Sequence, residues 1–549
     1  MHLLTLLRTI DTLNLRRIAG MAVVAALSNA FVLALINSAA NLGNSHGDQR
    51  VRLALMFAIV VVIFTISQQY LMIGAAKEVQ GMIHRIRSRM IEAVRQSELP
   101  DIESIGSTRI LNGTSKEIQT IAQASNIFAV TFQMALLVVF TTIYLMSLSM
   151  TAFLLAVGFM SLAITLYLGR AKRMTVAIQE AASTEYGLHE QLTSMLDGFK
   201  EIKLNNGRSQ ALGKHVVASS SHAAVERARA DTEYARNYIF AQNIFFLLLG
   251  TMVFIVPVLS EATAYNDTLL KTTTAVLFVM GPISCVVGAM PILANANNSA
   301  AHIIELERLL VHVSAPSRDR EAPDFPPPTS FSEIEFRNIK FHFEDTKAKE
   351  LFQVGPVNLK LRAGELVFIS GGNGSGKSTF LRLLTALYWP QAGTILVDGR
   401  PVTHSNVESY RALFSAVFSD YHLFKQLYGI EPAAAAEASE LLRLFEIKDK
   451  TNVQDAEFTT IDLSAGQRKR LALIVAMLEH RPICVLDEWA ADQDPIFRRK
   501  FYSELVGMLK ARGITVIAVS HDDRYYDCAE RRLHMEEGKV FEGQESAHA

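Results

Sequence analysis

The sequence predicts a membrane α-helical bundle of six transmembrane helices fused to a cytoplasmic α/β domain built around a phosphate-binding loop. Three observations support this fold class. Half of the 549 residues are hydrophobic and only 19% are charged, which is too apolar for an ordinary soluble protein. The long apolar stretches all lie in the first 310 residues. After residue 330, short apolar runs alternate with helix-like segments, and one run leads into a glycine-rich motif.

Six apolar stretches in the first part predict the membrane spans. Most of them reach the roughly 20 residues that cross a bilayer core, and none holds an Asp, Glu, Lys or Arg in its interior. They run approximately over Ile18–Ala40, Leu53–Ala75, Ile127–Leu148, Thr151–Leu168, Tyr238–Leu259 and Thr272–Leu293.

Positive charge predicts the orientation of these spans. Arginines and lysines are concentrated before the first span and in the long connections after the second and fourth spans, whereas the other connections carry few. By the positive-inside rule both termini are cytoplasmic. Ser38-Ala39-Ala40 resembles a signal-peptidase site, but the preceding apolar run is too long for a signal peptide and five further spans follow. The segment before Ile18 is too short for a peptidase domain, so we expect none there.

The two long connections, Ala76–Asn126 and Gly169–Asn237, are mostly helix-patterned. Helical arms of about 25 residues would project some 35–40 Å beyond the membrane. Turn-forming residues place the tips near Leu99–Gly113 and Asp197–Arg208. Such hairpins either carry force into the membrane or merely make the base of the bundle soluble. Amides within or beside the spans either line a path for cargo or form interhelical hydrogen bonds: Asn29, Gln68, Gln69, Gln133, Asn243 and Asn295–Asn298.

A proline-rich, charged stretch at Ser314–Ser330 predicts a linker. We therefore divide the chain into a transmembrane domain at residues 1–310, a linker at 311–330 and a nucleotide-binding domain at 331–549.

The glycine-rich motif has the pattern G-x-x-x-x-G-K-S and follows the apolar run Leu366–Ile369. A helix-patterned segment comes next, which is the context that a P-loop requires. Backbone N–H groups of the loop and the helix N-terminus would hold the phosphates of ATP. Lys377 can reach the β- and γ-phosphates, and the hydroxyl of Ser378 can bind Mg²⁺. The predicted ATP-binding residues of the loop are Gly371, Asn373, Gly374, Ser375, Gly376, Lys377, Ser378 and Thr379.

Three further features fit such a site. Asp487 and Glu488 follow a predicted buried strand, where the first can hold Mg²⁺ and the second can polarise a water molecule. Small and polar residues precede a helix and offer either an anion site or a plain N-cap: Ser464, Gly466 and Gln467. His521 follows another predicted strand and is either a γ-phosphate contact or a structural histidine.

Together these residues resemble those of ABC transporters. Gly371–Ser378 is similar to the Walker A motif, Leu463–Gln467 to the LSGGQ signature, and Ile483–Glu488 to Walker B with its catalytic glutamate. Ala491–Asp494 stands where that family has its D-loop, and the resemblance makes His521 the switch histidine. Phe343 stands at the aromatic position that stacks on adenine, or else is a core residue of its strand.

The order of the domains, the six spans and the long hairpins resemble the exporter type of this family. That resemblance implies a homodimer in which each ATP lies between the Walker A motif of one subunit and the signature of a second copy. Leu413–Phe424 and Asp487–Pro495 further resemble the branch that exports cyclic peptides and siderophores, including pyoverdine precursors, syringomycin-like lipopeptides and microcins. Two residues depart from the family pattern. Ser419 stands where a glutamine usually reaches Mg²⁺, which leaves Ser419 doubtful as a ligand, and Ala465 replaces a glycine.

The expected function is ATP-driven export of a peptide-derived metabolite by alternating access through a bacterial inner membrane, with membrane lipid around the spans. The alternatives are a lipid or multidrug exporter and, less favoured, an ATP-gated channel or regulator. The formal net charge of −1 argues against a nucleic-acid partner. The three cysteines match no metal or redox spacing. The cargo's identity and a periplasmic partner are left open.

Overall fold

The computed structural model describes residues 5, 13–40, 47–255, 265–313, 330–344, 350–430 and 435–542. The chain divides into two compact units. The first holds Met1–Arg95 and Ile105–Leu310, and the second holds Gln96–Ser104 and Val311–Ala549.

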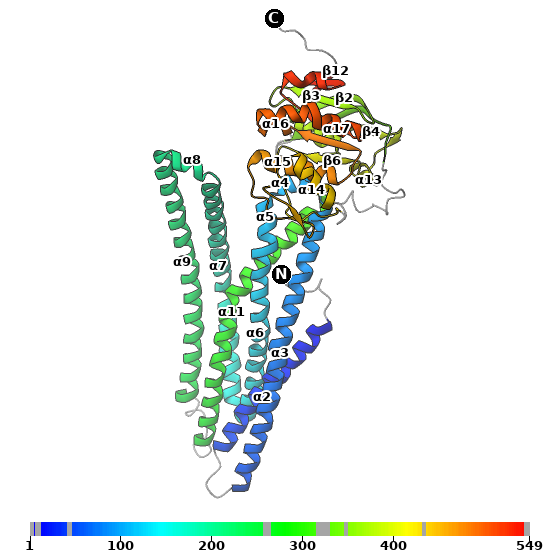
Figure 1. The fold of residues 1–549 in the computed structure, drawn as a ribbon. Coiled ribbons are helices and arrows are strands. Elements are labelled where there is room, and N and C mark those ends of the chain that lie inside the picture. Colours follow the sequence, from blue (N-terminus) through cyan, green and yellow to red (C-terminus); the bar gives the residue numbers. More distant parts are fainter. Residues whose placement is uncertain are drawn as a thin grey trace. The chain divides into compact units, whose positions relative to one another are not determined.

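The first unit contains six helices that are long and apolar enough to cross a membrane, counted over the described residues (Figure 1). They are α2 (Leu13–Ala40), α3 (Gly47–Gln96), α6 (Ile118–Leu148), α7 (Met150–Asp197), α9 (Asn206–Gly250) and α11 (Tyr265–Val313). The short helix η2 (Thr251–Ile255) extends α9. Each predicted span falls on one of these helices, except that residues 256–259 of the fifth lie outside the described part. The helices α3, α7, α9 and α11 are each more than twice as long as a bilayer core requires, so they continue well beyond it.

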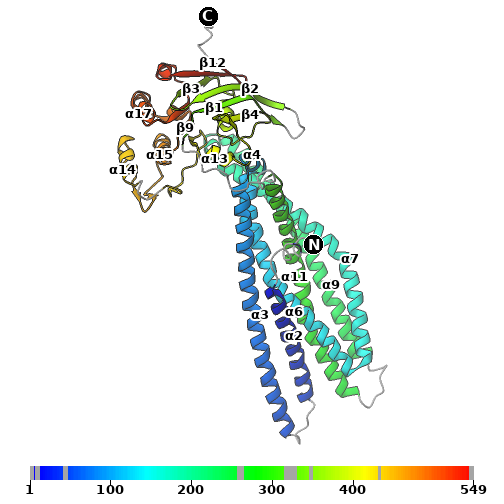
Figure 2. The ribbon, with the colours of Figure 1, turned by 90° about the vertical axis from the view of Figure 1, so that its right-hand side faces the viewer.

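Small and apolar side chains hold these helices together. α7 runs beside α9, and α2 packs on α6 (Figures 1 and 2). One buried cluster joins Leu33 of α2, Leu145 of α6 and Phe245 of α9. Gln133 of α6 donates a hydrogen bond of 2.8 Å to Gln68 of α3, so these two predicted amides pair with each other between helices. Apolar packing with occasional polar links is the usual way in which membrane helices associate.

Short helices occupy both predicted hairpin tips. After α3 come α4 (Leu99–Ile105), α5 (Ser107–Asn112) and η1 (Gly113–Glu117). Gly106, between α4 and α5, has a φ of 84°, a backbone conformation that glycine adopts at little cost. In the second hairpin, α8 (Phe199–Leu204) lies between α7 and α9. Phe199 and Leu204 of α8 are exposed apolar side chains.

The second unit is built on two larger sheets. The first is a six-stranded sheet of order β12-β11-β3-β10-β9-β6, parallel except for β12. Its strands are β3 (Leu366–Gly371), β6 (Phe414–Val417), β9 (Ile483–Asp487), β10 (Thr515–Val519), β11 (Arg531–Glu536) and β12 (Lys539–Glu542). This sheet contains the parallel core that the sequence predicts.

The other sheet has four strands in the order β2-β1-β4-β5, and its neighbours are antiparallel. Its strands are β1 (Glu333–Glu344), β2 (Glu350–Arg362), β4 (Ala392–Val397) and β5 (Arg400–Pro401). A two-stranded ribbon joins β7 (Val453–Gln454) to β8 (Glu457–Phe458). The strand–helix alternation in the sequence did not predict this separate antiparallel layer.

Helices and two apolar clusters complete this unit. α12 (Lys377–Leu384) contributes Phe380 to a core that also holds Phe336 of β1 and Val485 of β9. A second core holds Trp489 and residues of most of the remaining elements. The remaining elements are α13 (Val407–Arg411), α14 (Ala435–Leu444), α15 (Ala465–Leu478), η5 (Trp489–Asp492), α16 (Pro495–Lys500), η6 (Phe501–Leu505), α17 (Val506–Ala511) and η7 (Asp523–Cys528). Of these, α13 packs into the first core. The helix-forming run Ala433–Ala436 predicts a helix over residues 431–445. α14 falls within this range, and residues 431–434 lie outside the described part.

The tip segment Gln96–Ser104 belongs to this second unit. Glu98 forms a two-pronged ion pair with Arg411 of α13, and the Tyr388 hydroxyl donates a 2.8 Å hydrogen bond to Glu103. Arg382 of α12 lies 3.6 Å from Glu103. The segment is therefore held to the rest of the second unit by charged and polar contacts.

Candidate nucleotide-binding and hydrolysis site

The predicted phosphate loop connects the end of β3 to the start of α12, as the sequence predicts. Gly371 has a φ of 145°, and a β-carbon there would lie 2.3 Å from the Met535 carbonyl oxygen. Only glycine fits such a position. Lys377 is 5% exposed, and its ammonium donates to the carbonyl oxygens of Gly371 at 3.1 Å and Gly372 at 2.9 Å. Its positive charge is thus held within the loop.

The electrostatics of Lys377 suit an anion. Burial lowers the pKa of its ammonium, while the negative charges of Glu488 and Asp487 oppose that shift. An anionic ligand beside the ammonium would favour its charged form.

Strand order brings the other predicted residues to the same edge. β9, β10 and β3 are parallel neighbours, and Val519 pairs in register with both Asp487 and Ile369. The carboxyl ends of parallel neighbours lie together, which is where α/β sheets bind ligands. Glu488 directly follows β9, and His521 follows β10 by two residues.

Asp487 has the properties of a cation ligand. Its residue is 1% exposed, and neither carboxylate oxygen has a hydrogen-bond partner among the described residues. Burying a carboxylate that has no hydrogen-bond partner costs free energy. A divalent cation bound to these oxygens would offset that cost. This observation supports Asp487 as a residue that would hold Mg²⁺.

Glu488 is held in a strained conformation beside His521. Its φ of 48° and ψ of 35° lie in the left-handed region, which costs a residue with a side chain on the order of 1–3 kcal/mol. The Nε2 atom of His521 lies 2.9 Å from the Oε1 atom of Glu488. The two predicted catalytic side chains therefore contact each other.

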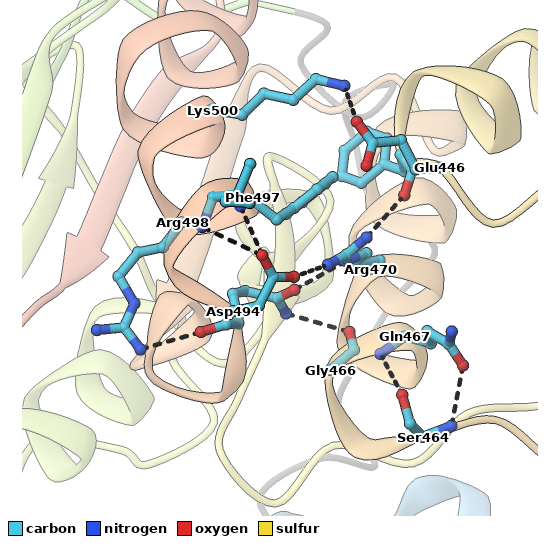
Figure 3. Close-up of polar contacts among 12 residues, drawn as sticks. Glu446, Ser464, Gly466, Gln467, Arg470, Asp494, Phe497, Arg498 and Lys500 are labelled. Atoms are coloured by element: carbon cyan, nitrogen blue, oxygen red, sulfur yellow. Dashed lines mark hydrogen bonds and ion pairs between the residues drawn. The ribbon is translucent and has the colours of Figure 1, made fainter.

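The signature residues form an N-cap. Ser464 caps α15 by accepting a hydrogen bond from the backbone of Gln467 at 3.4 Å, and the Gln467 side chain accepts from the backbone of Ser464 at 3.2 Å (Figure 3). This is a complete capping box, so the N-cap interpretation describes the local geometry. An anion site at the same helix end remains compatible with it.

The signature residues contact the turn after β9, through Gly466. Over the described residues, no hydrogen bond or ion pair joins Ser464, Gly466 or Gln467 to the P-loop. A β-carbon on Gly466 would lie 2.8 Å from the Asp492 carbonyl oxygen, so glycine permits a close approach. Gln493 donates to the Gly466 carbonyl at 3.1 Å and accepts from Arg470 at 2.9 Å. Arg470 also pairs with Asp494 at 2.6 Å (Figure 3).

The tight connection between α15 and this turn was not predicted from the sequence. The pattern indicates Arg468–Arg470 only as a basic start to a helix, yet Lys469 and Arg470 point into contacts with residues 488–494. The sequence does contain the complementary charges, because the basic residues Lys469 and Arg470 are followed later in the chain by Asp492 and Asp494. Pairing between segments so far apart in the chain cannot be derived from that pattern alone.

Phe343 and Ser419 are two further positions that the sequence analysis singled out. Phe343 is half-buried on β1, with its ring centroid 5.1 Å from that of Phe341 and 5.8 Å from that of Tyr388. It therefore packs against core aromatics, and a role toward adenine stays a prediction. Ser419 lies in a turn after β6, and its neighbour Asp420 accepts a hydrogen bond of 2.9 Å from Arg382.

Known proteins are similar to this chain in sequence. The family model described as ABC transporter matches residues 354–491. ATP-binding protein SyrD of Pseudomonas syringae pv. syringae is 32% identical over 83% of this chain and 82% of its own length. An ATP-dependent lipid A-core flippase of Neisseria meningitidis serogroup A is 25% identical over 80% of this chain and 71% of its own length.

The fold as a whole also has a solved counterpart. A bacterial Atm1-family ABC exporter with ATP bound aligns with a TM-score of 0.73, at 18% identity, over 97% of this chain and 95% of the exporter chain. The six described helices that are long and apolar enough to cross a membrane, the P-loop fold and the relative at 32% identity lead to one conclusion: the chain belongs to the ABC transporter family and has the fold of an exporter-type half-transporter.

Proposed function

We propose that this ABC exporter carries a peptide-derived secondary metabolite, such as a cyclic peptide, a lipopeptide or a siderophore precursor, across the bacterial inner membrane. The resemblance of Leu413–Phe424 and Asp487–Pro495 to the cyclic-peptide and siderophore branch carries this proposal. The identity of 32% with SyrD exceeds the 25% identity with the meningococcal flippase over a similar share of the chain, which agrees with a cargo other than lipid A.

A lipid or multidrug exporter is the second candidate. Several relatives are named lipid A-core flippases, and they cover most of this chain. The exposed apolar side chains of the membrane helices suit lipid contact in either case and do not separate the two cargo classes.

The proposed roles at the nucleotide combine the resemblance to ABC transporters with the geometry of the site. The P-loop and Lys377 bind the phosphates of ATP, and Phe343 contacts adenine. Ser378 and Asp487 hold Mg²⁺, which supplies charge neutralisation to the phosphates when it is bound. Glu488 polarises the attacking water, and His521 contacts the γ-phosphate. The contact between Glu488 and His521 favours hydrolysis over a gate that needs only ATP binding.

Two copies complete each site in this proposal. Ser464, Gly466 and Gln467 face the nucleotide held by the partner subunit, which agrees with the lack of a described contact between them and the P-loop of their own chain. Both termini lie in the cytoplasm. ATP binding closes the two ATPase domains, the hairpin tips move the spans from inward-open to outward-open, and hydrolysis resets them.

ATPase activity of the protein in lipid nanodiscs tests the cargo class. The compounds are a panel of cyclic peptides, siderophore precursors, lipids and lipophilic drugs. Stimulation by peptides or siderophore precursors alone supports the proposal, whereas stimulation by lipids or drugs alone supports the second candidate. High turnover that no compound changes would leave the cargo open and would make a regulator or a poorly coupled pump the next candidates to test.

Glu488→Gln tests the assignment of the catalytic residue. The amide cannot accept a proton from water, so we expect turnover to be lost while ATP binding remains. Equilibrium binding of a fluorescent ATP analogue and phosphate release would be measured on the same preparation. Turnover close to that of the unmodified protein would refute the role of Glu488.

A further inference from the structure

Lys469 is a buried cation in the second turn of α15, and its side chain is only 7% exposed. Its ammonium donates a 3.0 Å hydrogen bond to the backbone carbonyl of Glu488 and lies 2.7 Å from a carboxylate oxygen of Asp492. We propose that Lys469 is a positioning residue for ATP hydrolysis, which holds the Glu488 backbone in the conformation that presents its carboxylate to the nucleotide edge.

The backbone of Glu488 needs such support. Its left-handed φ of 48° is unfavourable for a residue with a β-carbon, and such conformations persist only where the surroundings enforce them. A return to an ordinary φ would rotate the carbonyl away from Lys469 and turn the side chain away from His521. The hydrogen bond from Lys469 therefore opposes the rotation that would misplace the carboxylate.

A second hydrogen bond runs in the opposite direction between the same two segments. The indole N–H of Trp489 donates to the backbone carbonyl of Lys469 at 2.7 Å, and the indole is 1% exposed. The ring centroid of Trp489 lies 4.5 Å from that of Phe501. Packing and the indole hydrogen bond can thus hold the segment near α15 without the ammonium. The distinct contribution of Lys469 is to fix the orientation of one peptide group, that of Glu488.

A charged donor suits this task. The Glu488 carbonyl also accepts from the backbone of Ala491 at 3.2 Å, which is a long contact within one turn. A hydrogen bond from an ammonium is stronger than one from a neutral amide, and burial strengthens it further. Asp492 balances the charge from a position that is half exposed, so the pair is not fully removed from water.

Lys469→Met is the test variant, because methionine keeps much of the length of the side chain and removes the donor. Lys500→Met is the matched control. Lys500 makes the same two kinds of contact. It donates a 2.9 Å hydrogen bond to the Leu444 carbonyl, and it forms a 2.6 Å ion pair with Glu446 (Figure 3). None of the contacts of Lys500 involves Glu488, so a general loss of stability would affect both variants.

The readouts are kcat and KM for ATP, with the melting temperature, on the full-length protein in nanodiscs. For Lys469→Met we expect kcat to fall about 10- to 100-fold, the scale of a misplaced catalytic group. We expect KM to stay within about threefold, since P-loop binding is not touched. Lys500→Met should keep kcat within about threefold of the unmodified protein at a similar loss of melting temperature.

Asp492→Asn keeps the test decisive if Lys469→Met does not fold. The Asp492 side chain is half exposed, so its change to asparagine should spare the fold while it loosens the ammonium. We expect a fall in kcat of at least about threefold with unchanged KM. Unchanged kcat in Asp492→Asn, unchanged kcat in Lys469→Met, or an equal loss in Lys500→Met would overturn the proposal.

This inference rests on the proposed catalytic role of Glu488, and Glu488→Gln separates the two. If Glu488→Gln retains turnover, the role of Glu488 is wrong whatever Lys469 does. If Glu488→Gln is inactive while Lys469→Met turns over normally, Glu488 stands and the positioning role of Lys469 fails.

Discussion

Asp494 joins two helices through different oxygens of one carboxylate. One oxygen caps α16 by accepting from the backbones of Ile496 at 3.1 Å and Phe497 at 2.9 Å. The other accepts from Arg470 of α15, whose guanidinium also lies over the Phe497 ring (Figure 3). The side chain thus connects the signature helix to the helix that follows the turn.

Separate variants resolve the two roles of Asp494. Asp494→Asn keeps a cap, since asparagine is an effective N-cap residue, and loses the charge opposite Arg470. Asp494→Ala loses both, and the loss of the cap alone should cost about 1 kcal/mol of unfolding free energy. We therefore expect stability to decrease from aspartate to asparagine to alanine. Thermal unfolding of the full-length protein would show the order, and equal melting temperatures for asparagine and alanine would contradict it.

The same carboxylate gives a pH dependence of known sign. The hydrogen bond from the Phe497 backbone, together with Arg470, lowers the pKa of Asp494 below its ordinary value. Its stabilising contribution is present above the unfolded-state pKa of about 3.9 and is lost as pH falls through the lower folded-state pKa. The stability difference between the unmodified protein and Asp494→Asn should therefore shrink on acidification below about pH 4. A difference that grew in that range would contradict the assignment.

Single residues were predictable where chemistry is local. The P-loop is one continuous motif, and Asp487, Glu488 and His521 follow strands that the sequence marks clearly. Lys469 was not predictable, because its partners lie in a distant turn of the chain, and no sequence pattern indicates the left-handed conformation of Glu488 there.

Among the elements, α4 shows how a few side chains tie a short helix to a larger fold. Within the second unit, Arg411 forms two hydrogen bonds to the Glu98 carboxylate and also donates to the Ala386 carbonyl. Leu99 adds an apolar contact with the first core. A seven-residue helix has little intrinsic stability, so these contacts determine whether the segment stays docked.

Arg411→Ala should loosen this segment. Loss of a charge-assisted, partly buried ion pair should lower the local opening free energy by about 1–2 kcal/mol, or about 5- to 30-fold in exchange rate. Hydrogen exchange with mass spectrometry would follow the amides of Gln96–Ser104. Arg524→Ala is the control, because Arg524 is exposed and its ion pair among the described residues is a long one, 3.9 Å to Asp522. Equal exchange in both variants would show that the ion pair with Glu98 does not hold the segment.

Most helices and strands could be located from the sequence, but not the sheet or the compact unit to which each one belongs. Long apolar runs predict membrane helices because a bilayer imposes a length and excludes charge. The tip at Leu99–Gly113 was predicted from turn residues. The assignment of Gln96–Ser104 to the second unit, however, depends on pairs such as Glu98–Arg411, whose members are distant in the chain. The antiparallel sheet was missed for the same reason: β4 pairs with β1 across a long stretch of chain that contains the P-loop.

At the scale of the whole molecule, we propose that each ATP is shared between two copies of the chain. Two variants that are each inactive should then complement each other in a mixed dimer. Lys377→Ala removes the phosphate-binding ammonium, and Ser464→Arg places a bulky cation at the start of α15. Each homodimer then carries the same defect in both sites. A mixed dimer instead combines both defects in one site and leaves the other site with an intact Lys377 and an intact Ser464.

Co-expression of the two variants should therefore restore vanadate-dependent trapping of a photoreactive ATP analogue. If subunits assort at random, half of the dimers are mixed and one of their two sites is intact, so about a quarter of normal trapping should return. Co-expression of Lys377→Ala with Lys377→Met is the control and should restore none, because both changes affect the same half of the site. Failure of the first pair to exceed the control, with both chains shown in one dimer by differential tags, would mean that each chain builds its nucleotide site alone.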